Sequence, residues 1–173
     1  MKIINTKYTL LLFSLAYFLL FSCSGTITFN GSRTLENTIY DKPVVANGSL
    51  QGNNVKFKAL TVNGALKLKD STVDGPLKVS GSADLEKMDL RNDAEIKGNL
   101  TLKDSKAKNI SIQGEKATLM GDIYIDGELH FSGQKGSVTI SPETTITKGI
   151  VNGELTDRGA QPKTGPIIKG QPQ

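Results

Sequence analysis

The fold is decided by a segment that occurs twice, as Gly-Ala-Leu-Lys-Leu-Lys-Asp-Ser at residues 64–71 and as Gly-Asn-Leu-Thr-Leu-Lys-Asp-Ser at residues 98–105. A third glycine, Gly81, lies halfway between Gly64 and Gly98, so the basic period is 17 residues. Each of these glycines follows an apolar residue and one polar residue. Self-similarity at a short fixed period indicates a solenoid, in which each repeat packs only against its neighbours.

A finer alternation runs through the repeats. Apolar residues come as doublets that one outward-facing residue separates, which is the signature of a strand with one face in a core. No segment after residue 23 has the i, i+3, i+4, i+7 apolar spacing of a helix, so we expect essentially no helix there. The doublets are Val55/Phe57, Leu60/Val62, Leu66/Leu68, Leu77/Val79, Ala83/Leu85, Met88/Leu90, Ala94/Ile96, Leu100/Leu102, Ile110/Ile112, Ala117/Leu119, Ile123/Ile125, Leu129/Phe131 and Val138/Ile140, with weaker members around Val73 and Ala107.

Three short strands per 17-residue repeat predict an all-β fold, a parallel β-solenoid (β-helix) of roughly triangular cross-section. Each strand then stacks on its equivalent in the next turn at about 4.8 Å. We expect regular coils from about Val44 to Leu155, in roughly six turns, with a loop where residues 133–136 interrupt the alternation. The core is expected to be a thin column of aliphatic side chains, because only 6% of the residues are aromatic.

The charged residues test this register. If turns stack at 17, residues i and i+17 are neighbours on the outer surface, where opposite charges attract. Between Lys67 and Lys108, eight such pairs are opposite in sign and one, Arg91 with Lys108, is like. In the same register Asn92 falls over Asn109. The eight pairs are Lys67/Asp84, Lys69/Glu86, Asp70/Lys87, Asp74/Arg91, Lys78/Glu95, Glu86/Lys103, Lys87/Asp104 and Asp89/Lys106.

The first residues have the pattern of a secretory signal peptide. Lys2 and Lys7 form a basic region, and residues 10–21 are an apolar stretch of about twelve residues, shorter than the roughly 20 that span a bilayer. The stretch ends in Leu-Phe-Ser-Cys at residues 20–23, which resembles the lipobox of bacterial lipoproteins. That resemblance implies diacylglycerol on the Cys23 sulfur, cleavage before Cys23, and usually an acyl chain such as palmitate on the new amino group. It also implies attachment of the exported chain to a membrane.

Four segments follow from these patterns. Residues 1–22 are the lipoprotein signal peptide, residues 23–43 a lipidated tether with an N-terminal cap, residues 44–156 the solenoid domain, and residues 157–173 a disordered Pro/Gly-rich tail. A cap is expected because a solenoid end exposes apolar core and unpaired strand edges. Ser24, the second residue of the mature chain, resembles the signal that sorts lipoproteins to the outer membrane.

The solenoid body, at about residues 44–155, resembles the bactofilins, which are polymer-forming β-helical scaffolds. The resemblance rests on the repeat period and the Gly-x-hydrophobic pattern, and it implies self-association through the solenoid ends. The body also resembles the β-helical head domains of bacterial surface adhesins, which follow export signals as this body does. The second resemblance implies a glycan or a host protein as ligand.

Candidate catalytic residues are few. His130 is the single histidine and lies between two inward residues, so we expect it on the surface. Cys23 is the single cysteine and carries the lipid, which leaves no thiol for catalysis or for a Cys/His zinc site. Asp122 and Asp126 are the nearest approach to an acid cluster. We therefore predict a protein that is not an enzyme, with no catalytic residue, no metal site and no cofactor.

The formal charge of +4 does not point to nucleic acid, because acidic and basic residues are interspersed along the chain. The expected function is that of a structural or protein-interaction module. It is exported, lipid-anchored through Cys23 to the outer membrane on its periplasmic or surface face, and has an envelope protein or a glycan as partner. The alternatives are an adhesin-like or ligand-binding surface lipoprotein, and a self-assembling, bactofilin-like scaffold.

Overall fold

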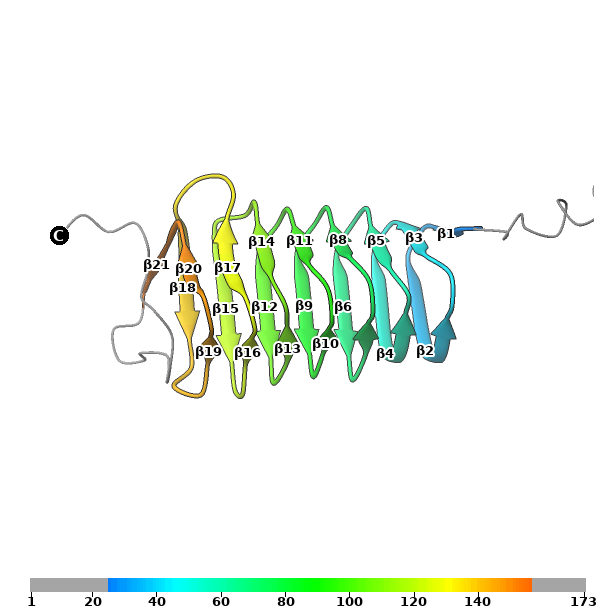
Figure 1. Ribbon diagram of the computed structural model, residues 1–173. Helices are drawn as coiled ribbons and strands as arrows, with labels where there is room; N and C mark the ends of the chain where they lie inside the picture. Colours follow the sequence, from blue (N-terminus) through cyan, green and yellow to red (C-terminus); the bar gives the residue numbers. More distant parts are fainter. Residues whose placement is uncertain (1–24, 157–173) are drawn as a thin grey trace, which may run out of the picture.

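The computed structural model describes residues 25–156 and shows a β-solenoid of parallel strands stacked along one axis (Figure 1). No helix in this part of the chain has the length and apolar character needed to cross a membrane. One side of the stack, termed the first face, is an eight-stranded sheet. Its strands are β1 (Ile27–Asn30), β3 (Val44–Asn47), β5 (Leu60–Val62), β8 (Leu77–Val79), β11 (Ala94–Ile96), β14 (Ile110–Ile112), β17 (Glu128–Phe131) and β20 (Gly149–Val151).

The remaining strands form a thirteen-stranded sheet that bends into a second and a third face. The bend is visible in β4 (Leu50–Phe57), which pairs through its first half with β6 (Leu66–Lys69) and through its second half with β7 (Thr72–Val73). β2 (Arg33–Tyr40) pairs with β4 over both halves. The second face continues from β6 through β9 (Ala83–Glu86), β12 (Leu100–Lys103), β15 (Lys116–Met120), β18 (Gly136–Ile140) and β21 (Gly153–Leu155). The third face continues from β7 through β10 (Asp89–Leu90), β13 (Lys106–Ala107), β16 (Tyr124–Ile125) and β19 (Thr145–Ile146).

The predicted fold class and the 17-residue register are confirmed. Leu60 pairs with Leu77, and Leu77 pairs with Ala94, in parallel strands one turn apart. Six of the eight opposite-charge pairs expected from the sequence lie within ion-pair distance. They are Lys67–Asp84 (3.4 Å), Lys69–Glu86 (3.6 Å), Lys78–Glu95 (3.6 Å), Lys87–Asp70 (4.0 Å), Arg91–Asp74 (2.9 Å) and Lys103–Glu86 (3.4 Å).

The solenoid is longer than the sequence predicted, with about eight turns rather than six. The segment expected to hold a tether and cap contains β1 and β2, which continue the parallel stack: Ile27 pairs with Val44, and Tyr40 with Phe57. Within residues 25–43, a cap distinct from the coil is therefore absent. The prediction missed this turn because an end turn has a neighbour on one side only, and its alternation of apolar and polar residues is weaker.

One side-chain prediction is wrong. Ala94 pairs with Ile110, a step of 16, so Asn109 lies over Asp93 and not over Asn92. The Asn109 side-chain amide donates to the Asp93 carboxylate at 2.8 Å. Asparagine ladders form elsewhere, at Asn47 to Asn30 (3.1 Å), Asn63 to Asn47 (2.8 Å) and Asn54 to Asn37 (2.8 Å).

The core is the expected aliphatic column. Every residue of the predicted doublets is buried, and so are Val73 and Ala107. Phe57 and Phe131 are the largest fully buried side chains. The column also takes in residues outside the doublets: Val44, Ala46, Leu50, Ile146 and Ile150.

Glycines stack at the corner between the first and second faces. A Cβ added to Gly81 would lie 2.6 Å from the carbonyl oxygen of Gly64, which is closer than real Cβ atoms approach. The turns come so close at this corner that no side chain fits, which explains the glycine that recurs in the sequence. The column consists of Gly31, Gly48, Gly64, Gly81, Gly98 and Gly114.

The corner between the second and third faces has left-handed backbone. Asparagine and aspartate tolerate this conformation better than most residues, so their recurrence there has a local cause. The column consists of Asn37 (φ 48°), Asn54 (55°), Asp70 (49°), Lys87 (51°), Asp104 (47°) and Gly121 (72°).

Ser71 and Ser105, the last residues of the segment that occurs twice, lie just after this corner, and their buried hydroxyls form hydrogen bonds to the backbone. The Ser105 hydroxyl accepts from the Met88 amide at 2.9 Å and donates to the Lys103 carbonyl at 2.6 Å. Ser71 repeats the arrangement one double turn earlier, with the Val55 amide. Two buried backbone amides are thereby satisfied by side chains, where a strand ladder is interrupted.

The last turns are less regular. Ile110 pairs with Leu129 and Leu129 with Ile150, nineteen and twenty-one positions apart. Extra residues between β17 and β18 leave the stack as a loop, drawn in yellow at the top of Figure 1. This is the loop expected near residues 133–136, except that Gly136 already belongs to β18.

Candidate binding grooves

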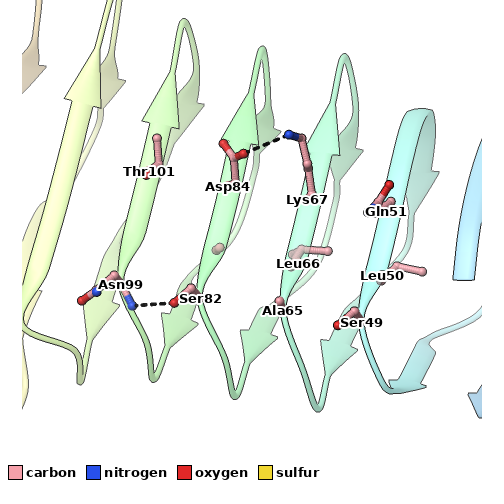
Figure 2. A pocket seen from close by; sticks show the side chains of 11 residues that line it. Ser49, Leu50, Gln51, Ala65, Leu66, Lys67, Ser82, Asp84, Asn99 and Thr101 are labelled. Atoms are coloured by element: carbon pink, nitrogen blue, oxygen red, sulfur yellow. Dashed lines mark hydrogen bonds and ion pairs between the residues drawn. The ribbon is translucent and has the colours of Figure 1, made fainter. Parts of the chain in front are cut away.

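A hollow of about 450 Å³ runs along the second face beside the glycine corner and is termed the second-face groove (Figure 2). Four successive turns each contribute two side chains to its walls: the residue that follows the corner glycine, and the next outward residue of the strand. The groove is lined by the first row, Ser49, Ala65, Ser82 and Asn99, by the second row, Gln51, Lys67, Asp84 and Thr101, and by Leu50, Leu66 and Ala83 between the rows.

The strand alternation explains why this groove exists. Leu50 and Leu66 turn into the core and are 0% and 1% exposed, so only backbone lies between the two outward rows. The side chains of the first row, which follow the tight glycine corner, are small or medium-sized and project only a short distance from the backbone. The result is an open channel that is parallel to the solenoid axis and has the same construction in each turn.

The polar groups of the groove offer side-chain recognition. The Lys67 ammonium lies 3.4 Å from the Asp84 carboxylate, and both side chains are more than half exposed, so the ion pair is weak and open to exchange with a ligand. The backbone between the two rows already forms hydrogen bonds between adjacent turns. The Leu66 amide donates to the Ser82 carbonyl at 2.9 Å, and the Ala83 amide donates to the Asn99 carbonyl at 2.9 Å. A ligand would therefore bind through contacts with the two rows of side chains, and not by pairing with the backbone as an added strand.

Two smaller hollows adjoin on the first face and share Asp93, Ala94 and Ser111. One measures about 360 Å³ and contains Lys78 and Glu95, which form an ion pair at 3.6 Å. The other measures about 390 Å³ and contains His130. His130 was expected on the surface, and it lies half-buried at the surface of β17, level with Ser111 of the preceding turn. The remaining lining residues with polar side chains are Asn92, Asn109, Glu128 and Lys148.

A further hollow of about 430 Å³ lies along the left-handed corner. It alternates charge from turn to turn, with Asp70, Lys87 and Asp104 in one row and Asp89 and Lys106 in the next. Alternation of this kind pairs the charges within the protein and leaves no single sign of potential for a ligand.

The charge ladders shift three ionisation equilibria. A hydrogen bond from Lys56, and the charges of Lys56 and Arg91, hold the pKa of Asp74 below its usual 3.8. Partial burial acts to raise the pKa of Glu86, but Lys103 and Lys69 on the flanking turns outweigh it and hold the pKa below its usual 4.5. The hydrogen bond and charge of Asp89, with Asp74, raise the pKa of Arg91.

The site residues predicted from the sequence fall in two groups. Cys23 and Ser24, the lipidation and sorting residues, lie outside the described residues, as do the signal peptide and the tail at residues 157–173. Asp122 and Asp126 flank Ile123–Ile125, and Asp126 accepts a hydrogen bond from the Tyr124 hydroxyl at 3.4 Å. Across residues 25–156, no group of three or more His, Cys, Asp or Glu side chains is placed to hold a metal ion.

The grooves themselves were not predicted, although the sequence carries a signal for one of them. The residue after each corner glycine is small or polar: Gly48-Ser49, Gly64-Ala65, Gly81-Ser82 and Gly98-Asn99. Reading the positions next to the glycines at the same period would have located the first row of the second-face groove.

Comparison of the chain with protein-family models, with curated proteins and with solved structures finds no match in any of the three. The class that the structure defines is therefore that of the fold, a parallel all-β solenoid.

Proposed function

We propose that this chain is an exported lipoprotein, anchored through acyl chains on Cys23, whose solenoid is a non-enzymatic module for protein interaction at the outer membrane. The sequence pattern at residues 1–24 supports the export, the anchor and the membrane. The second-face groove supports the interaction role. The partner that fits best is an elongated polypeptide segment of an envelope protein.

The observation that carries the interaction role is the repetition of the groove lining over four turns. A segment that lies along the axis meets two side-chain rows at a repeat of about 4.8 Å. Such a surface suits a partner that is itself extended, because one straight segment along the axis can contact all four turns at once. Flat or concave solenoid faces are used for binding in other repeat proteins.

The anchor is tested by Cys23→Ala. Removal of the thiol removes the site of acylation, so radiolabelled palmitate is no longer incorporated and the chain is recovered unprocessed or in the soluble fraction. Ser24→Asp is the matched control: it retains the label, but it moves the protein from the outer-membrane to the inner-membrane fraction. Labelled, normally anchored Cys23→Ala protein would overturn the proposal.

The groove is tested by photo-crosslinking in the intact cell. A photoreactive amino acid replaces Gln51, which is exposed in the second-face groove and makes no ion pair with a described residue. The control places the same amino acid at Lys108, which is exposed at the corner between the third and first faces. We expect a defined protein adduct from position 51 alone. Equal adducts from both positions, or none from position 51, would argue against a partner in this groove.

A further inference from the structure

The N-terminal end of the solenoid presents apolar side chains that no described turn covers. Ile27 and Tyr40 face the core but are only half-buried. Their strand partners one turn later, Val44 and Phe57, are 1% and 0% exposed. Among the strands of residues 25–156, β1 pairs with β3 alone and β2 with β4 alone. This apolar end is termed the end surface and consists of Ile27, Phe29, Leu35 and Tyr40.

The end surface has the composition of a membrane-interface contact. Tyr40 stacks on Phe57 at 5.4 Å and meets the edge of Phe29 at 5.9 Å. The Arg33 guanidinium lies 5.9 Å from the centre of the Phe29 ring. At the same end, on β2, Ile39 is 75% exposed. Aromatic rings with a polar tip, and cations beside apolar surface, are favoured at the level of lipid headgroups.

The sequence places the expected lipid next to this end. Only Ser24, Gly25 and Thr26 separate Cys23 from the first residue of β1. Four fully extended residue steps span at most about 14 Å. Acyl chains on Cys23 therefore hold the first turn at the membrane surface, whichever way the solenoid leans.

We propose that the end surface docks on the phospholipid headgroup region, so that the bilayer covers the open end and the solenoid stands on the membrane by its first turn. This inference rests on the lipid anchor proposed above. The docking depth is limited to the interface, because the free edges of β1 and β2 carry backbone groups that hydrocarbon cannot satisfy. The first turn carries Arg33 and Lys42 against Glu36 and Asp41, so docking requires no anionic lipid.

The test uses the full-length, processed and lipidated protein in vesicles of phosphatidylcholine with brominated acyl chains. The chain has no tryptophan, so a single introduced indole reports alone. Ile39→Trp reports on the end surface, and Tyr124→Trp is the matched control. Both positions are exposed, at 75% and 44%, and face outward on the third face, five turns apart, which is about 24 Å along the axis.

We expect the Ile39→Trp emission to shift to the blue and to be quenched at least twofold more than that of Tyr124→Trp. Equal quenching of both would mean that the solenoid lies on its side, and this would overturn the proposal. Protein that floats with the vesicles while neither indole is quenched would overturn docking and leave the anchor intact. Blue-shifted but unquenched Ile39→Trp emission that depends on protein density would assign the end surface to a second copy of the chain. Failure to float, with no lipid on Cys23 by mass spectrometry, would defeat the anchor and, with it, this inference.

Discussion

The first turn and an interior turn of this solenoid have the same backbone and the same inward direction of alternate residues, yet they differ in what they bury. Leu68 lies between turns on both sides and is 1% exposed, whereas Leu35 lies in the first turn and is half-buried. A turn of 17 residues cannot enclose a core by itself. Its burial is shared with its neighbours, so position in the stack sets the effect of a substitution as much as the residue does.

The largest expected effect comes from a charge in the column. Leu68→Asp places an unpaired carboxylate among aliphatic side chains and should cost about 3–5 kcal/mol, enough to unfold neighbouring turns. Leu35→Asp in the first turn should cost about 1 kcal/mol, because water reaches that carboxylate. Denaturant unfolding followed by circular dichroism measures both. Equal costs for the two variants would contradict the assignment of the first turn as an open end.

A second comparison sets the glycine column against a loop glycine. A methyl group on Gly81 would meet the Gly64 carbonyl and force two turns apart, so Gly81→Ala should cost about 3 kcal/mol. Gly133 lies in the loop before β18, and a Cβ there would come no closer than 3.7 Å to another atom, so Gly133→Ala should change stability by less than about 0.5 kcal/mol. Thermal melts distinguish the two. A harmless Gly81→Ala would mean that the corner is less tightly stacked.

The buried serines give a smaller effect that also depends on the neighbouring turn. Ser105→Ala leaves the Met88 amide buried without a partner, and we expect a loss of about 1–2 kcal/mol. Ser111→Ala is the control, since Ser111 faces outward on β14 and is half-exposed. Hydrogen exchange at the Met88 amide should speed up in Ser105→Ala alone. Unchanged exchange would show that water takes over the role of the hydroxyl.

The smallest effect is expected from pH. Asp74 lies between Lys56 and Arg91 of the flanking turns, and Glu86 lies between Lys69 and Lys103. Because both carboxyls belong to turns with a neighbouring turn on each side, cations on both sides lower their pKa. A carboxyl whose pKa is lower in the folded state stabilises the fold at pH values above its pKa in the unfolded state. This stabilisation is lost as the pH falls through the pKa of the folded state. Stability should therefore decline slightly as pH drops below about 4.5 for Glu86 and below about 3.8 for Asp74.

Glu86→Gln should flatten the upper part of that acid limb in a pH series of melting points. The corresponding control is Glu154→Gln, because Glu154 near the C-terminal end pairs with Lys135 alone among the described residues. An acid limb of the same slope in Glu86→Gln and in the parent protein would show that other carboxyls dominate it.

Much of the fold could be predicted because its causes are local and repeated. Alternation of apolar and polar residues indicated which side chains face inward, and the eight opposite-charge pairs 17 residues apart between Lys67 and Lys108 indicated the register. The candidate grooves were harder to predict. They depend on how the outward rows of adjacent turns align in space, and their residues, such as Ala65 and Gln51, have no chemistry that marks them in isolation.

The amino-acid order alone determined the strand period, the inward residues, the corner glycines and the N-terminal lipobox pattern, because each depends on residue type and spacing along the chain. The tertiary structure decided that β1 and β2 join the stack, that the register steps by 16 at Ile110, and that Ser105 satisfies the Met88 amide. These features arise from contacts between turns. When one turn is a residue shorter or longer than 17, counting along the chain no longer tells which residues of adjacent turns face each other, and only the three-dimensional structure does.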